Sequence, residues 1–238
     1  MIDILLTTTQ QHMWKFEHRE KETDEVSTFI YVPNVFSRET SIQLRGWLDY
    51  QYTEFHGGTT SFGTSIPRKQ KWFQEEGKYF CESWKLRIPR WEASLYPHYL
   101  KEIQTLVYSK FSELDIDYST IQNPCLNSCL INLYRDGNDS IKPHRDSPES
   151  FGFKPTIIGI SLGETRTMKV QHIHFNEENI QSLKPNREEE VSFTLQLHDN
   201  SMFIMGGASQ KYFTHEILKD ETVSNPRYSL TFRQFNSM

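Results

Sequence analysis

The chain has 238 residues, and its 26 basic and 31 acidic side chains give a formal net charge of −5. This length suffices for one domain whose core needs no disulfide bonds, and the three cysteines form no CxxC pair, which excludes a four-cysteine zinc motif and favours free thiols. The negative charge excludes nucleic-acid binding through the whole surface, so such binding needs a local basic patch. Because no segment resembles a signal peptide or a membrane span, we expect a soluble intracellular monomer of the nucleus or cytoplasm that makes no membrane contact.

The first 124 residues are predicted to hold regular structure at three places. We expect one strand and two helices, which cover residues 28–32, 38–52 and 99–111. Ser37 is a suitable N-cap for the first helix, and Pro97 precedes the second. Residues 1–25 are polar and charged without a clear period, which favours a flexible N-terminal arm. The remaining residues of this part are rich in glycine, threonine, and basic and aromatic side chains, and are predicted to be loops.

From Cys125 onward the sequence consists of short β segments. They cover residues 129–133, 140–143, 156–162, 167–175, 191–197, 201–205, 213–218 and 227–235. Many short strands separated by glycine, proline and asparagine indicate a β-sandwich or jelly roll. The fold class is therefore mainly β with flanking helices (α+β). A jelly-roll core is expected over residues 125–238, and residues 26–124 are expected to form an extension of that same domain.

Two histidines and one aspartate are candidates for a metal site. His144 and Asp146 are two residues apart, so in an extended segment both side chains project to one side. His215 must come from a distant strand, which a jelly roll allows. Two imidazoles and one carboxylate form the facial triad that holds Fe(II) and leaves coordination positions open. Three other histidines compete with His215: His172, His174 and His198. The first two alternate within a predicted strand, where we expect them to face solvent or a charged partner.

The last predicted strand carries two arginines on one face. Arg227 and Arg233 are six residues apart, and Leu230 and Phe232 alternate with them. One face of this strand is therefore core, and the other is a polar floor with two guanidinium groups. Because burying unpaired cations is costly, a bound dicarboxylate is a reasonable partner for them.

These motifs together resemble the AlkB family of Fe(II)/2-oxoglutarate-dependent dioxygenases, closest to the branch of eukaryotic DNA-repair homologues. In chain order the motifs are Pro67-Arg68-Lys69-Gln70, Asn132-Leu133-Tyr134, His144-x-Asp146, His215 and Arg227-x5-Arg233. The resemblance covers about residues 28–235 and implies a double-stranded β-helix core with an N-terminal helix and a substrate lid. It implies an oxidative demethylase of N-alkylated bases in DNA, such as 1-methyladenine and 3-methylcytosine, which uses Fe(II), 2-oxoglutarate and O2 in alkylation-damage repair. Demethylation or hydroxylation of an RNA base, and an oxygenase acting on a substrate other than nucleic acid, remain alternatives.

The resemblance also implies roles for individual residues. Iron would be held by the catalytic residues His144, Asp146 and His215. The cosubstrate would be bound by Asn132, Tyr134, Arg227, Ser229 and Arg233. Methylated DNA or RNA would be contacted by Phe62, Arg68, Lys69, Gln70, Trp72, Phe73, Tyr79, Phe80, Arg145, Glu149 and Arg166. The aromatic rings in this set would stack on a flipped base, and the cations would contact phosphates. Phe62 would insert into the base stack as a wedge.

The chain departs from the family pattern at two positions. Ser229 stands where the family often has asparagine, and its hydroxyl can still donate a hydrogen bond. Pro148 stands where repair members carry an acidic residue that helps to read the base. Glu149 can take that role if the loop shifts.

Overall fold

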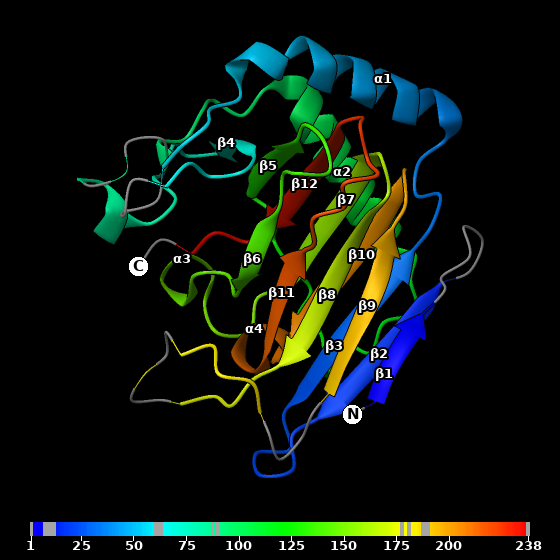
Figure 1. The fold of residues 1–238 in the computed structure, drawn as a ribbon, viewed down its shortest axis with the longest axis vertical. Coiled ribbons are helices and arrows are strands. Elements are labelled where there is room, and N and C mark those ends of the chain that lie inside the picture. Colours follow the sequence, from blue (N-terminus) through cyan, green and yellow to red (C-terminus); the bar gives the residue numbers. More distant parts are fainter. Residues whose placement is uncertain are drawn as a thin grey trace.

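The computed structural model describes residues 13–59, 64–86, 88, 91–176, 179, 182–186 and 191–236, and the backbone of residues 2–6. Two β-sheets lie face to face (Figure 1). The smaller one has the order β1-β9-β8-β11-β6, with strands Ile2–Leu6, Val191–Leu197, Arg166–His172, Phe213–Ile217 and Ile141–His144. The larger one has the order β2-β3-β10-β7-β12-β5-β4, with strands Trp14–Arg19, Val26–Val32, Ser201–Gly207, Ile157–Gly163, Arg227–Arg233, Ser128–Tyr134 and Lys69–Gln74. Among the described residues, neighbouring strands of both sheets are antiparallel except for the parallel pair β1–β9.

Alternation along the strands creates a separate core on each face of the larger sheet. On β12, Tyr228, Leu230 and Phe232 belong to the core that also holds the helices. Residues of the opposite face of this sheet, such as Phe29 and Phe203, pack against the smaller sheet. The predicted division of the last strand into an apolar face and a polar face is therefore confirmed, and its polar face lies between the sheets.

Two helices cover the outer face of the larger sheet (Figure 1). Helix α1, Arg38–Tyr50, is capped by Ser37, whose hydroxyl accepts a hydrogen bond from Thr40 N at 3.1 Å. Helix α2 is His98–Ser112. Single helical turns occur at Tyr52–Glu54 (η1), Glu82–Trp84 (η2), Pro148–Phe151 (α3) and Ser209–Tyr212 (α4). In the described part of the chain, no helix is long and apolar enough to span a membrane.

The N-terminal half contains more strand than the sequence predicted. Residues 14–19 form β2, so the expected flexible arm over residues 1–25 is wrong there. Residues 69–74, expected to be irregular, form β4. Both strands, and β3, belong to the larger sheet, so this sheet extends well before residue 125. The two-sheet core and both long helices are as predicted.

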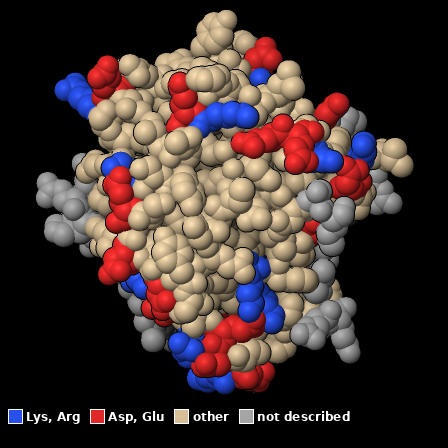
Figure 2. All heavy atoms as spheres, turned by 180° about the vertical axis from the view of Figure 1, so that it is seen from behind, with Lys and Arg blue, Asp and Glu red and all other residues tan. Residues whose placement is uncertain are grey.

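Charges of both signs are mixed on the face of the molecule that lies opposite to the view of Figure 1. Lys and Arg side chains lie among Asp and Glu around its edge, and its middle is mainly uncharged (Figure 2). Among the described residues, this face therefore presents no broad basic surface for a phosphate backbone.

Candidate active site

The three predicted metal ligands meet between the sheets. His144 is the last residue of β6 and pairs directly with His215 on the neighbouring strand β11. Their ring centroids are 4.2 Å apart. Asp146 follows two residues later, and one ligand atom from each of the three residues lies within 4.8 Å of the others. The strands therefore bring together a facial set of two imidazoles and one carboxylate.

Burial prepares both histidines for metal binding, and a hydrogen bond orients the ring of His144. His144 Nδ1 lies 3.0 Å from the carbonyl oxygen of Lys142, which leaves Nε2 for a metal. Burial lowers the pKa of both imidazoles, and at His215 the neighbouring positive charge of Arg233 lowers the pKa further. Neutral imidazole is the form that coordinates metals, so the site favours the binding form at neutral pH.

A buried ion pair orients the carboxylate of Asp146. Arg233 Nε lies 2.5 Å from Asp146 Oδ2, and Arg233 Nη2 donates to Asp146 Oδ1 at 3.3 Å. The backbone amide of Asp146 donates to Gln210 Oε1 at 2.9 Å. The guanidinium also lies over the ring of Phe151, at 4.8 Å from its centroid. These contacts fix the ligand and give the Arg233 cation a partner.

Arg227 lies on the same face of β12, and no described residue gives it such an anionic partner. Its side chain is 2% exposed, Nε donates to Ser161 Oγ at 2.8 Å, and the guanidinium carbon lies 5.1 Å from the centroid of the Tyr134 ring. Burial lowers the pKa of Arg227 to about 10. Within the described residues, Nη1 has no hydrogen-bond partner. A buried cation with a free N–H group fits the distal carboxylate of a small dicarboxylic acid.

A cavity of about 790 Å³ joins the metal ligands to Arg227. Its inner end is lined by hydroxyl, amide and phenol groups of the larger sheet, which come from Asn132, Tyr134, Ser161, Ser201, Ser229 and Thr231. Apolar side chains complete the walls, among them Met168 and Leu197. The cavity is large enough for a dicarboxylate beside the metal and a further ligand toward the mouth.

Comparison with known proteins agrees with this geometry. The model of the 2OG-Fe(II) oxygenase superfamily matches residues 28–233. The chain belongs to this superfamily. Its described residues include the complete set of two histidines and one aspartate that can hold Fe(II).

Relatives of this oxygenase place it near two branches of AlkB-like proteins. The mouse protein "Alpha-ketoglutarate-dependent dioxygenase alkB homolog 3" is 32% identical over 143 residues, which are 58% of this chain and 43% of the mouse protein. The bovine "DNA oxidative demethylase ALKBH2" is 30% identical over 116 residues, 49% of this chain and 40% of that protein. The match therefore spans less than half the length of either relative.

Solved structures support the fold of the oxygenase. The non-heme alpha-ketoglutarate-dependent epimerase SnoN from nogalamycin biosynthesis aligns with a TM-score of 0.54 at 11% identity, over 87% of this chain and 78% of that one. A prolyl hydroxylase from Trichoplax adhaerens aligns with a TM-score of 0.50 at 15% identity, over 87% and 83% of the two chains. At these identities the likeness concerns the fold alone.

Four of the residues predicted to contact substrate line the cavity of the oxygenase: Arg68, Gln70, Phe80 and Arg145. Arg68 Nε and Gln70 Nε2 both donate to Asn132 Oδ1, at 3.0 and 2.9 Å. Arg68 also donates to the carbonyl oxygen of Ser140 at 3.3 Å, which joins the segment before β4 to the start of β6. Arg145 donates to the carbonyl oxygen of Lys211 at 2.9 Å. These cations are therefore held in place at the cavity by the protein itself.

Three aromatic residues predicted to stack a base are instead buried in the protein. Trp72 is 1% exposed among the rings of Phe80 and Phe151, and Phe73 is 3% exposed in the core that holds the helices. Tyr79 is buried, and its hydroxyl donates to the carbonyl oxygen of Ile88. Adjacent residues of a strand point to opposite faces, and both faces of β4 are covered. Their expected role as stacking surfaces is therefore corrected to a role in packing.

The remaining predicted contacts lie away from the cavity or outside the described residues. Lys69 Nζ lies 4.8 Å from the centroid of the Tyr52 ring. Glu149 accepts hydrogen bonds from the backbone amide and hydroxyl of Ser83, at 3.1 and 2.8 Å, so it anchors η2. Arg166 is 1% exposed and donates to backbone carbonyls of residues 136, 137, 139 and 218, so its guanidinium holds two loops. Phe62 lies outside the described residues.

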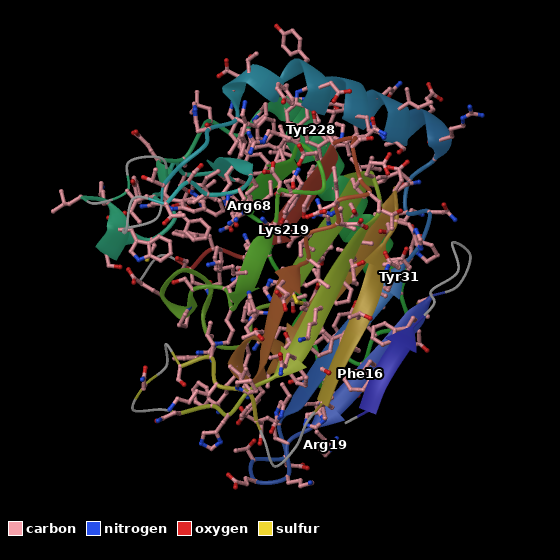
Figure 3. All side chains as sticks on the ribbon, viewed as in Figure 1. Phe16, Arg19, Tyr31, Arg68, Lys219 and Tyr228 are labelled. Carbon is pink, nitrogen blue, oxygen red and sulfur yellow. The ribbon has the colours of Figure 1, made fainter. Side chains whose placement is uncertain are left out.

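The sequence reasoning missed four residues around the mouth. Trp84 and Trp91 line the cavity with Phe80, whose ring stacks on both, with centroids 5.8 and 4.4 Å apart. The exposed Lys142 and Lys219 also line the cavity, and Figure 3 shows Lys219 and Arg68 on the same side of the molecule. The high aromatic content of residues 80–91 was the available signal for the two tryptophans. Nothing local to either lysine distinguished it from an ordinary surface cation.

Proposed function

We propose that this oxygenase removes methyl groups from N-methylated bases, such as 1-methyladenine and 3-methylcytosine, in DNA. The observation that carries the proposal is the position of the Phe80, Trp84 and Trp91 rings, which line the cavity that contains the iron ligands. Enzymes that act on a base extrude it from the strand and hold it against aromatic side chains. The similarity to proteins named alkB homolog 3 and DNA oxidative demethylase ALKBH2 supports the same substrate class.

Each group of residues has a distinct task in this reaction. His144, Asp146 and His215 hold the iron, and Arg227 binds the distal carboxylate of 2-oxoglutarate. When bound, Fe(II) with 2-oxoglutarate and O2 supplies the oxidising chemistry that hydroxylates the methyl group, which then leaves as formaldehyde. Arg233 keeps the carboxylate of Asp146 oriented. The apolar walls of the cavity exclude water from the reacting groups.

The mouth of the cavity supplies the features that a nucleic acid requires. Trp84 is partly exposed, so its ring is available to an extruded base. Phe80 is buried and stacks on the rings of both Trp84 and Trp91. Lys142 and Lys219 are exposed on the rim, and neither makes an ion pair with any described residue. Free cations beside an aromatic pocket are suited to the phosphates that flank a base.

A turnover assay tests the proposal. The purified protein is incubated with Fe(II), 2-oxoglutarate and matched DNA or RNA oligonucleotides that carry 1-methyladenine or 3-methylcytosine. Mass spectrometry is expected to show loss of one methyl mass with equimolar succinate, and the Asp146→Ala variant is expected to form none. Succinate without methyl loss would indicate an active oxygenase with a different substrate and refute the proposal.

The RNA oligonucleotides in this assay test whether Pro148, which replaces the acidic residue of the family pattern, changes the preferred substrate. This residue begins α3, and the neighbouring Glu149 is bonded to Ser83, so the acidic side chain next to Pro148 does not line the cavity. Base reading at this site therefore differs from the pattern of repair enzymes. Faster turnover of RNA than of DNA would assign the activity to an RNA base.

A further inference from the structure

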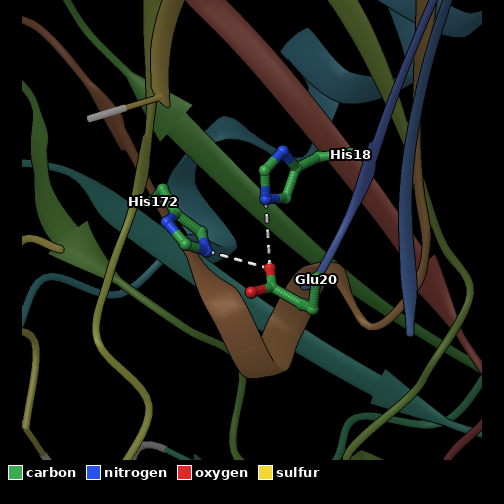
Figure 4. A group of neighbouring side chains, drawn as sticks. All are labelled: His18, Glu20 and His172. Atoms are coloured by element: carbon green, nitrogen blue, oxygen red, sulfur yellow. Dashed lines mark hydrogen bonds and ion pairs between the residues drawn. The ribbon is translucent and has the colours of Figure 1, made fainter. Parts of the chain in front are cut away.

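A second group of two histidines and one carboxylate lies between the sheets, at the end of β2. His18 belongs to β2, Glu20 follows it, and His172 is the last residue of β8. His172 Nε2 lies 2.9 Å and His18 Nε2 lies 3.4 Å from the same oxygen, Glu20 Oε1. Figure 4 shows both rings directed at this carboxylate through the same ring nitrogen. The cluster is independent of the iron ligands and is not used by the proposed reaction.

The 3.4 Å separation of His18 Nε2 from Glu20 Oε1 matches the donor spacing of a zinc site, and the 2.9 Å separation of His172 Nε2 from the same oxygen is slightly shorter. Zinc binds imidazole nitrogen and carboxylate oxygen at about 2.0–2.2 Å, so two donors of a tetrahedral site lie about 3.4 Å apart. One donor atom from each of His18, Glu20 and His172 lies within 4.8 Å of the others, the same limit that the iron ligands meet. The second set therefore satisfies the same distance limit with the same donor types as the first.

The surroundings favour a bound cation over a solvated cluster. The three side chains are between 1% and 11% exposed. The ring of Phe213 contacts both imidazoles, with centroids 5.5 Å from His18 and 4.9 Å from His172. Two imidazoles and one carboxylate that share a nearly buried site are donor types that zinc takes.

The cluster also connects parts of the fold that are far apart in the chain. Strand β2 is an edge strand of the larger sheet, whereas β8 lies inside the smaller sheet. His172 pairs with Phe213 on β11, two residues from the iron ligand His215. A metal bound here would therefore clamp the two sheets together next to the catalytic centre.

We propose that His18, Glu20 and His172 bind a divalent transition metal of the zinc type, with water in the remaining position. The ion cross-links the first strand of the larger sheet to the smaller sheet. Borderline ions such as Zn(II) suit this donor set of two nitrogens and one oxygen, whereas Mg(II) and Ca(II) prefer oxygen donors alone.

Zinc stoichiometry tests the site. The tag-free full chain is stripped with a chelator, loaded with Zn(II), desalted and measured for metal per chain. Because zinc also occupies iron triads, the wild type is expected to bind about two ions, and the double variant His144→Ala/His215→Ala about one. In that background, His18→Gln/His172→Gln is expected to bind none, and His174→Gln, at an exposed histidine of the same region, is the matched control that keeps the ion.

A second measurement keeps the test decisive if the His18→Gln/His172→Gln change prevents folding. Zn(II) is expected to raise the melting temperature of the His144→Ala/His215→Ala protein by a few degrees, because an ion that binds only the folded state stabilises it. Co(II) bound at the same site is expected to give the visible bands of a low-symmetry nitrogen–oxygen site. If the His144→Ala/His215→Ala protein binds no zinc and its melting temperature does not change, the cluster is a metal-free hydrogen-bonded triad and the proposal is overturned.

Discussion

The same substitution should have opposite effects on protein stability at the two arginines of β12. Arg227 and Arg233 share one face of one strand and are 2% and 4% exposed. Arg233 is paired with Asp146, whereas no described residue bonds Arg227 Nη1. Replacement by methionine keeps most of the volume of either side chain and removes its charge. We expect Arg227→Met to stabilise the cosubstrate-free protein and Arg233→Met to destabilise it.

The magnitudes follow from the contacts of each guanidinium. Burial lowers the pKa of Arg227 to about 10, so the folded state disfavours its charge by about 3 kcal/mol. Methionine loses the hydrogen bond to Ser161 and the contact with the Tyr134 ring, together about 1–2 kcal/mol. The net gain in the free energy of unfolding is therefore about 1–2 kcal/mol. Arg233→Met leaves the carboxylate of Asp146 buried without its cation, which costs about 3–5 kcal/mol.

Function should change in the opposite direction to stability at Arg227. Loss of a charge-assisted, two-pronged contact with the distal carboxylate is worth about 2–5 kcal/mol, so KM for 2-oxoglutarate should rise by about 30-fold to more than 1000-fold. Urea denaturation with and without 2-oxoglutarate measures both effects, and succinate release measures KM. An Arg227→Met protein that is less stable than wild type, yet still stabilised by 2-oxoglutarate, would refute the assignment of Arg227 as the carboxylate anchor.

Three further predictions concern the mouth and the second cluster. Trp84→Ala should raise KM for a methylated oligonucleotide by about 5–150-fold, whereas Trp84→Phe should keep most of the affinity, because a stacked base contributes about 1–3 kcal/mol; equal loss in both variants would argue against stacking. Lys142→Ala and Lys219→Ala should each reduce the slope of log K against log salt for single-stranded DNA by about 0.7, as a binding titration at several salt concentrations can show. Lys154→Ala, which removes a lysine already paired with Glu25, is the control whose slope stays that of the wild type. As the pH falls from 4.5 toward 2, the metal-free wild type should lose up to about 3 kcal/mol of stability relative to Glu20→Gln. The reason is that the pKa of Glu20 is lowered in the folded state, so the ionised side chain contributes its full stability only above the pKa of the unfolded chain. Acid-dependent unfolding of both proteins measures this difference, and a constant difference across that range would contradict it.

The sequence predicts those parts of the site in which functional residues are spaced two positions apart along an extended segment. His144 and Asp146 were found because residues two apart in an extended segment share a side. The same period separates the apolar and polar faces of β12, and it placed both arginines on the polar face. A jelly roll allows a distant histidine to join them, the family resemblance selected His215 among four candidates, and His215 pairs with His144 because β6 and β11 are neighbouring strands.

The missed parts depend on contacts that a local pattern does not contain. The segment of β2 alternates Trp14, Phe16 and His18 with charged residues, but three charges in six positions concealed the strand. Trp72 and Phe73 were predicted to stack on a nucleic-acid base because basic residues surround them in the sequence. Both rings are buried, because the sheet is covered on both faces at β4. The contact between Glu20 and His172 joins residues 152 positions apart and follows only from the packing of the two sheets.

The catalytic centre is divided between the sheets. The histidine ligands belong to the smaller sheet, and both arginines to the larger one. The position of the histidine ligands relative to Arg227 thus depends on how the two sheets pack, which in such sandwiches lie about 10 Å apart. Neither sheet alone can hold both iron and 2-oxoglutarate. Binding of both therefore shows that the two sheets have packed together. The rings and cations of the mouth lie outside this frame, mostly on loops. Exchange of those loops can therefore change the substrate of the oxygenase while the arrangement of its iron ligands and arginines is left intact.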